Sequence, residues 1–298
     1  MNKQTYWLIG LLIFIVIIFI IIQSSQPELE ESASSTFTKF DTLGITRIQI
    51  DAPNDENDIT LQKVESTWQI VEPIQYPADE RKIQLALGSL AKIPPNPDVI
   101  SENPKKQNKF QVDSTGTNLT IYKDDEIVAD LITGKSDKMR AHTFVREENS
   151  DKVVSIPGNL SYFIGQPLNQ WRDKSIVNIP FEEFYKIEYQ NKDIEININR
   201  EDTAWQVTKN REEISPDEAK IEGLLQLFNP LRARGFAEEV TDLNWNNSDT
   251  ELRLITKDNS TFNIKFIEKD NNSYYAKLDE RATIFIVSKY LIDRLSFD

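Results

Sequence analysis

The sequence predicts an α+β fold: an N-terminal transmembrane helix followed by two related halves, each a mostly antiparallel sheet with a packed helix. Three observations predict it: an apolar run near the N-terminus, an internal repeat built around two tryptophans, and polar–apolar alternation on both sides of each repeat's helix. Strands that follow one another along the chain, with a helix laid on one face of their sheet, are typical of the α+β class.

The apolar run covers residues 6–22 and contains no charged side chain. As a helix it spans about 25 Å, which is near the lower limit for a bilayer core of about 30 Å. A cleaved signal peptide is the alternative, but its apolar segment is usually shorter and ends at a small-residue cleavage site. The nearest such site is Ser32-Ala33-Ser34, and it is a poor one. We therefore expect an uncleaved transmembrane anchor at 6–22, preceded by a cytoplasmic tail at 1–5.

The charges beside the anchor predict its orientation. Lys3 precedes the apolar run, whereas Glu28, Glu30 and Glu31 follow it. Positive flanks stay in the cytoplasm, so the C-terminal body is expected in the periplasm or extracytoplasmic space. The predicted location is the inner (cytoplasmic) membrane, in a single-pass topology. Residues 23–42 are rich in Ser, Glu and Thr, which is the composition of a flexible linker.

The composition excludes several classes of protein. Of all residues, 39% are hydrophobic and 28% charged, which is the balance of a folded chain. The net charge of −14 predicts no binding to nucleic acid, because phosphates would be repelled. The chain has no cysteine, which excludes a lipid-modified cysteine anchor and agrees with export into an oxidising compartment.

The internal repeat divides the body into a first α+β repeat at 43–178 and a second at 179–298. Ser-Thr-Trp-Gln-Ile at 66–70 is echoed by Thr-Ala-Trp-Gln-Val at 203–207. Pro-Ala-Asp-Glu at 77–80 is echoed by Ser-Pro-Asp-Glu at 215–218, and both precede an amphipathic helix. Apolar residues line one face of each predicted helix at i, i+4 and i+7: Ile83, Leu87 and Leu90 in the first, and Ile221, Leu225 and Phe228 in the second. Asp79 and Asp217 stand where an N-cap or first-turn acid is favoured.

Strand-like alternation flanks both helices in the same order. Each repeat is predicted to read strand-strand-strand-helix-strand-strand-strand-strand-helix, with a long loop from Pro94 to Gly116 inside the first. The paired segments are 46–50 with 185–189, 59–62 with 194–198, 119–124 with 252–258, 143–146 with 274–277, and 153–156 with 284–287, and short apolar helices follow near Leu160 and Leu291.

Short motifs give the chain a family resemblance. They lie in order at 68–70, 78–79, 109–113 (Lys-Phe-Gln-Val-Asp), 132–135 (Ile-Thr-Gly-Lys), 143–146 (Thr-Phe-Val-Arg) and 171–174 (Trp-Arg-Asp-Lys). Together they resemble the bacterial domain of unknown function 4340 family over about residues 45–298, with the second half a more diverged copy. The resemblance implies an N-terminal anchor and an exported body, and some members occur beside transporter components linked to gliding motility. It implies no activity and no catalytic residues.

The residues that could support chemistry have simpler structural explanations. His142 is the single histidine and comes directly before a predicted strand, where a surface position is expected. The acidic segment 51–58 lacks the ligand rhythm and the glycine of a calcium loop, so a hairpin loop is expected. Gly134-Lys135-Ser136 lacks the upstream glycine of a phosphate-binding loop; we expect a turn after a strand. We predict no catalytic, cofactor-binding or metal-binding residues, and no cofactor.

Two further pairs of residues have either a binding role or a structural role. Trp68 and Trp205 occupy equivalent places and could form a platform for carbohydrate or peptide, but equivalent core anchors explain them more simply. Arg172 and Asp173 lie where the halves join, and we expect them to tie the halves together rather than to form a site.

The predicted function is a non-enzymatic, membrane-anchored binding or scaffold protein of the bacterial envelope. Its expected partners are the membrane, through the N-terminal helix, and another envelope or transporter protein. The expectation that the protein is an accessory component of a transporter complex rests on the family resemblance alone. One alternative is an envelope glycan hydrolase that acts through paired carboxylates. A purely structural spacer is the other.

Overall fold

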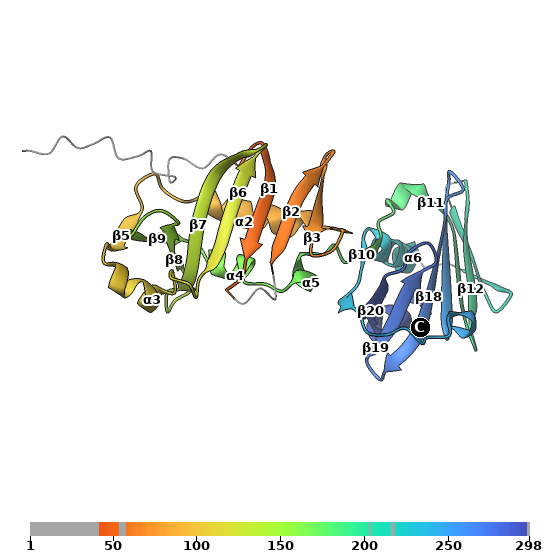
Figure 1. Ribbon diagram of the computed structural model, residues 1–298. Helices are drawn as coiled ribbons and strands as arrows, with labels where there is room; N and C mark the ends of the chain where they lie inside the picture. The colour runs from red at the N-terminus through yellow and green to blue at the C-terminus, as the bar shows by residue number, and fades with distance from the viewer. Residues whose placement is uncertain (1–41, 54–57, 203, 216–217, 297–298) are drawn as a thin grey trace, which may run out of the picture. The chain divides into compact units, whose positions relative to one another are not determined.

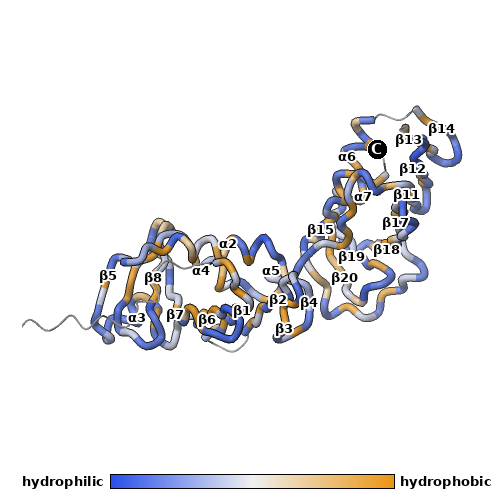
Figure 2. Tube along the Cα trace, turned by 90° about the horizontal axis from the view of Figure 1, so that it is seen from above, coloured by the Kyte–Doolittle hydropathy of each residue, from blue (hydrophilic) through white to orange (hydrophobic). Residues whose placement is uncertain are grey.

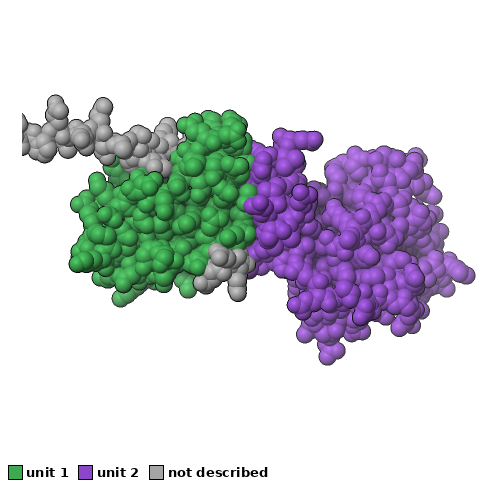
Figure 3. All heavy atoms as spheres, viewed as in Figure 1, with its two compact units in different colours: residues 1–60, 84–165 green, residues 61–83, 166–298 purple. Residues whose placement is uncertain are grey.

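A computed structural model describes residues 42–53, 58–202, 204–215 and 218–296. The predicted tail at 1–5, the anchor at 6–22 and all but the last residue of the linker at 23–42 lie outside the described residues. Within the described ranges, no helix is long and apolar enough to cross a membrane. Contacts divide the chain into two compact units (Figure 3), of which unit 1 comprises residues 1–60 and 84–165 and unit 2 residues 61–83 and 166–298.

The first sheet has nine strands in the order β4-β3-β2-β1-β6-β7-β8-β9-β5. Figure 1 shows its central strands side by side. The strand pairs of known register are antiparallel, as in Ile48 opposite Ile121 between β1 and β6. The strands are β1 (Ile45–Asp51), β2 (Ile59–Val64), β3 (Thr67–Glu72), β4 (Tyr76–Pro77), β5 (Asp98–Ser101), β6 (Thr117–Lys123), β7 (Glu126–Ser136), β8 (His142–Glu147) and β9 (Val153–Pro157).

Helix α2 (Glu80–Leu90) follows β4, and Asp79 stands at its N-cap. The Asp79 carboxylate accepts a hydrogen bond from the Lys82 backbone N–H at 3.4 Å, as an N-cap acid does. Ile83, Leu87 and Leu90 are buried, as the spacing of the apolar residues predicts. The remaining helices of this part are short: η1 (Pro104–Lys106), α3 (Gln107–Phe110), α4 (Leu160–Ile164) and α5 (Leu168–Trp171).

The second sheet has nine strands in the order β14-β13-β12-β11-β17-β18-β19-β20-β16. They are β11 (Phe184–Asn191), β12 (Glu195–Glu201), β13 (Ala204–Lys209), β14 (Glu212–Ile214), β16 (Gly235–Phe236), β17 (Thr250–Thr256), β18 (Thr261–Asp270), β19 (Ser273–Leu278) and β20 (Ile284–Ser288). A separate two-stranded sheet joins β10 (Ser175–Val177) to β15 (Leu231–Arg232). The helices are η2 (Phe181–Glu183), α6 (Glu218–Leu225), η3 (Gln226–Phe228), η4 (Trp245–Asn247) and α7 (Lys289–Leu295).

The predicted class, α+β with large antiparallel sheets and few helices, is confirmed. Each strand of the first sheet has a counterpart in the second, in the same spatial order. The predicted order of elements lacks two short strands in each sheet, β4 and β5 in the first and β14 and β16 in the second. The segment from Pro94 to Gly116 is not a plain loop, because it contains β5, η1 and α3. Asp217, the predicted first-turn acid of α6, lies outside the described residues.

The core of the second sheet follows from alternation along its strands. In β17 the buried positions Thr250, Leu252, Leu254 and Thr256 alternate with more exposed ones, as expected of a sheet covered on one face. Figure 2 shows the polar and apolar stretches following one another through these strands. The buried aliphatic side chains of α7, Leu291, Ile292 and Leu295, join this core.

Candidate functional site

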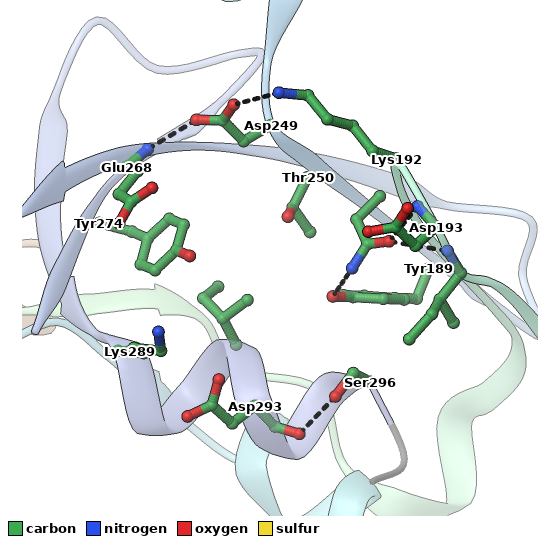
Figure 4. A pocket seen from close by; sticks show the side chains of 13 residues that line it. Tyr189, Lys192, Asp193, Asp249, Thr250, Glu268, Tyr274, Lys289, Asp293 and Ser296 are labelled. Carbon is green, nitrogen blue, oxygen red and sulfur yellow. Dashed lines mark hydrogen bonds and ion pairs between the residues drawn. The ribbon is translucent and has the colours of Figure 1, made fainter. Parts of the chain in front are cut away.

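A hollow in unit 2 brings together side chains from four strands and one helix (Figure 4). Its volume of about 380 Å³ falls within the range of small-molecule pockets. Polar residues dominate the lining, which comprises Tyr189, Asn191, Lys192, Asp193, Ile194, Asp249, Thr250, Glu268, Tyr274, Lys289, Ile292, Asp293 and Ser296.

Strand pairing places these residues together. Antiparallel pairing of β11 with β17 sets Asn191 opposite Thr250, and pairing of β18 with β19 sets Glu268 opposite Tyr274. Helix α7 supplies Lys289, Ile292 and Asp293. The pocket therefore lies where one end of the sheet meets α7.

Hydroxyl groups form the inner part of the pocket. Tyr189 is almost fully buried, and its hydroxyl accepts a hydrogen bond from the Asn191 amide at 3.0 Å. Thr250 is only 4% exposed, and no hydrogen bond to its hydroxyl is found among the described residues. The Tyr274 ring points into the hollow, as Figure 4 shows. These groups offer oxygen acceptors below a charged rim.

The rim carries four carboxylates and two ammonium groups. Asp249 pairs with Lys192 at 3.7 Å and also accepts a hydrogen bond from the Glu268 backbone N–H at 2.8 Å. Neither Asp193 nor Asp293 forms a side-chain ion pair within the described ranges. Acidic groups thus outnumber basic ones around the opening.

The pKa of the Tyr274 hydroxyl is raised in the pocket. Burial raises the pKa of its hydroxyl, and the nearby carboxylates of Glu268, Asp249 and Asp293 raise it further. Negative neighbours oppose a phenolate and favour a bound cation for the same electrostatic reason.

A second hollow of similar volume lies on the other face of the same strands, because Glu188 and Gln190 alternate with Tyr189 along β11. Its charges are largely matched. Glu188 contacts Lys186 at 2.5 Å and Arg253 at 3.4 Å, and Lys265 contacts Asp279 at 4.0 Å. The first pocket differs from this second hollow in its excess of carboxylates over ammonium groups.

The described residues contain no group of three or more His, Cys, Asp or Glu side chains that could hold a metal ion. The carboxylates of the first pocket are spread around its rim rather than gathered at one point. This arrangement suits contact with a ligand larger than a single ion.

The sequence gives little sign of this pocket. Tyr189 and Tyr274 fall in segments predicted as strands, but nothing marks their hydroxyls as neighbours. The usable signal is the alternation itself, which would place Tyr189 on the same face of β11 as the core residue Ile187.

The single histidine occupies the surface position that the sequence predicts. His142 is the first residue of β8, and its side chain is half exposed. Its ring Nδ1 lies 3.3 Å from Asp137, which is also partly exposed.

The acidic segment 51–58 joins β1 to β2, as expected of a hairpin loop. Asp58 accepts a hydrogen bond from the Ala52 backbone N–H at 2.9 Å, which closes the loop near its ends. Residues 54–57 lie outside the described residues.

The predicted turn at Gly134-Lys135-Ser136 is wrong, because these residues are the last three of strand β7. The pairing of β7 with β8 shifts register between Thr133 and Ser136. Glycine is required here because a Cβ at 134 would meet the Phe110 carbonyl, with Val112 Cγ1 at 2.7 Å and the Gln111 carbonyl at 2.9 Å. The residue allows close packing of backbone and indicates no phosphate site.

The two equivalent tryptophans behave as core anchors. Trp68 in β3 is buried, and Trp205 in β13 is half-buried and packs on the core. Each lies under a cation from the neighbouring strand, Lys63 at 5.6 Å and Arg200 at 5.4 Å. The matched contacts agree with the structural interpretation of the pair.

Arg172 connects segments of both predicted repeats within unit 2. Its guanidinium lies over the rings of Phe236 at 3.6 Å and Tyr76 at 4.3 Å. It also donates to Asn169 at 2.9 Å and contacts the Glu238 carboxylate. A guanidinium held between two aromatic rings is a packing element, in agreement with the prediction that Arg172 is a tie.

Asp173 belongs to a neighbouring polar cluster. It contacts Arg232 at 3.4 Å, and Arg232 also donates to the Ser175 hydroxyl at 3.1 Å. Lys82 lies beside the cluster, and its ammonium group donates to the Gln170 carbonyl at 3.1 Å. Burial of that group, and then the charge of Lys174, lowers the pKa of Lys82 to about 8.

A different kind of surface lies at the end of the first sheet. Strand β5 is the last in the order, and among the described residues it pairs with β9 alone. Val99 and Ile100 are 50% and 44% exposed, so two aliphatic side chains stand on an open edge.

Comparison with known proteins identifies a family but no activity. No curated protein matches the chain. The model of the family described as "Domain of unknown function (DUF4340)" matches residues 68–253, which is more than half of the 298 residues. The resemblance seen in the sequence motifs is confirmed, and the chain belongs to the domain of unknown function 4340 family.

Proposed function

We propose that the chain is a membrane-anchored, extracytoplasmic binding or scaffold protein whose partner is another protein of the bacterial envelope, such as a transporter subunit. The single observation that supports this function best is the exposed edge strand β5. The anchor and the location rest on the apolar run at 6–22 and on its flanking charges.

An open edge strand presents unpaired backbone N–H and C=O groups that can pair with a strand of another protein. In the part of the chain that the structure describes, strand β5 has such an edge, because β9 occupies only one of its sides. Val99 and Ile100 add exposed apolar area to that edge, next to the exposed Asp98 that begins the strand.

The corresponding strand of the second sheet is unlike β5. Strand β16 is two residues long, and its Phe236 is covered by the Arg172 guanidinium and packs against Phe285. A partner strand therefore has more backbone to pair with at β5 than at β16.

A site-specific crosslinking experiment in cells tests the proposal. A photoreactive amino acid replaces Val99 or Ile100 in the full-length chain, and the matched control carries it at Ile127. Ile127 is also exposed but lies in β7, which has a neighbour on each side. We expect one integral membrane protein to be captured at 99 and 100 but not at 127.

A second variant links the crosslink to strand pairing. The double substitution Val99→Lys and Ile100→Lys places charge on the edge and should abolish co-purification of the captured protein. Equal capture at 127, or co-purification unchanged by the two lysines, would contradict the proposal. If the chain is only a spacer, no position captures a partner and the lysines leave its cellular role intact.

The location has its own test. A reporter that is active only outside the cytoplasm, fused after Asp298, should be active in growing cells. A fusion that works solely with a cytoplasmic reporter would overturn both the orientation and the proposed class of partner.

A further inference from the structure

We infer that the pocket between the end of the second sheet and α7 binds a small organic molecule through a primary ammonium group. This inference stands apart from the proposed function, since the pocket belongs to unit 2 and shares no residue with β5.

The inner hydroxyls supply the first part of the argument. The Thr250 hydroxyl lines the pocket, its residue is 4% exposed, and it has no hydrogen-bond partner among the described residues. A hydroxyl that faces a cavity and forms no hydrogen bond within the protein is free to bond to a ligand or to water in that cavity. The Tyr274 hydroxyl also faces the cavity without a hydrogen bond inside the described ranges.

The rim supplies the charge. Asp193, Glu268 and Asp293 approach the opening from the turn before β12, from β18 and from α7. No salt bridge within the described ranges engages these three carboxylates, whereas Asp249 is paired with Lys192. The Lys289 ammonium group also lies on the rim, so these three carboxylates face one cation. A ligand cation entering the pocket therefore meets a net negative charge above and oxygen acceptors below.

The geometry favours an ammonium group over a metal ion. A calcium ion needs six to eight oxygens gathered at about 2.3–2.6 Å, and the described residues contain no such group of carboxylates. An ammonium group has three donors and is satisfied by separate oxygens at ordinary hydrogen-bond distances. Burial is the main cause of the raised pKa of Tyr274, and the smaller contributions of Glu268, Asp249 and Asp293 have the sign that favours a cation.

The rest of the lining indicates what the ammonium group is attached to. Ile194 and Ile292 give the pocket an apolar side. A short aliphatic chain next to the ammonium group would bury its methylene groups there, each contributing to affinity through the hydrophobic effect. The ligand class is therefore a primary alkyl amine.

Titration of the full-length chain in detergent micelles with n-pentylamine tests the inference, with n-pentanol as the neutral probe of equal length. Isothermal calorimetry should detect saturable binding of the amine and none of the alcohol. Asp293→Asn and Thr250→Val should each weaken binding by about tenfold, because each removes one acceptor for a charged donor.

Asp279→Asn is the matched control, since Asp279 lies in the other hollow of the same sheet and faces Lys265. It should leave the affinity unchanged. If Asp279→Asn weakened amine binding equally, the amine would be attracted only by the net charge of −14 and not by the pocket. That result would overturn the inference. Binding of the alcohol as tight as that of the amine would overturn it as well. Neither result would bear on crosslinking at β5.

Discussion

The guanidinium of Arg232 donates a hydrogen bond to the Asp79 carboxylate at 2.6 Å, although 153 positions separate them in the sequence. Asp79 stands at the N-cap of α2, and Arg232 ends β15. Their side chains are 16% and 27% exposed, so the pair is shielded from water on most sides. Shielding strengthens the attraction and makes the loss of one partner costly.

Arg232→Leu should lower the free energy of unfolding by about 1–3 kcal/mol, because Asp79 and Asp173 would both keep a partly buried charge and lose their contact with the guanidinium. Urea unfolding followed by tryptophan fluorescence measures the effect. Arg211→Leu is the control, since Arg211 is exposed and pairs loosely with Glu195 at 3.9 Å. It should leave stability close to that of the unmodified chain. Equal effects of the two substitutions would contradict the assigned role of Arg232.

Lys82 should titrate near pH 8, because burial and then the charge of Lys174 lower its pKa, while Asp79 raises it. Only the neutral amine reacts with acetic anhydride, so pulse labelling at a series of pH values, read by mass spectrometry, gives the midpoint. Lys174→Gln should move the midpoint upward, because it removes a repelling charge. A midpoint at the usual value for lysine, or one insensitive to Lys174→Gln, would contradict the placement of Lys82.

The lowered pKa of Lys82 also determines how its contribution to stability changes with pH. Between the folded pKa of about 8 and the usual value of 10.5, the unfolded chain binds more protons at Lys82 than the folded chain. The contribution of Lys82 to the free energy of unfolding therefore rises with pH across that window. It is least favourable below the window, where the partly buried ammonium group stays charged. Lys82→Met should remove this rise.

Trp68→Ala should be more destabilising than Trp205→Ala, although the two tryptophans are equivalent in the repeat. Trp68 is buried and Trp205 only half-buried. Removing a fully buried tryptophan side chain typically costs about 3–5 kcal/mol. Thermal unfolding of both variants measures the difference. Loss of a binding activity from both variants without loss of stability would favour the platform interpretation instead.

The long strands could be predicted because their side chains alternate between a covered and an open face. The segment 46–50 falls inside β1, and 185–189 falls inside its counterpart β11. Strand β4 could not be predicted, because its two residues are extended only through pairing with Gln69 and Ile70. Alternation needs several residues to be visible, and a two-residue strand offers none.

The pocket could not be predicted because its residues meet only after the strands have paired. Tyr189, Thr250 and Tyr274 come from three strands, and the sequence does not specify that β11 pairs with β17. Arg172 and Asp173 were easier to interpret, since charged residues between two repeats are expected to join them. The partners of Arg172, Tyr76 and Phe236, again depend on tertiary contacts.

Gly134→Ala should destabilise the chain by about 2 kcal/mol or more, because overpacking against backbone leaves little room to relax. Its Cβ would meet the carbonyl groups of Phe110 and Gln111, which cannot rotate away as a flexible side chain does. Gly88→Ala is the control: it lies in α2 with nothing within 4 Å of the new Cβ. It should stabilise the helix by about 0.5–1 kcal/mol, since alanine is the better helix former. Urea unfolding of both variants would show shifts of opposite sign, and a neutral Gly134→Ala would mean that β7 does not pass this close to α3.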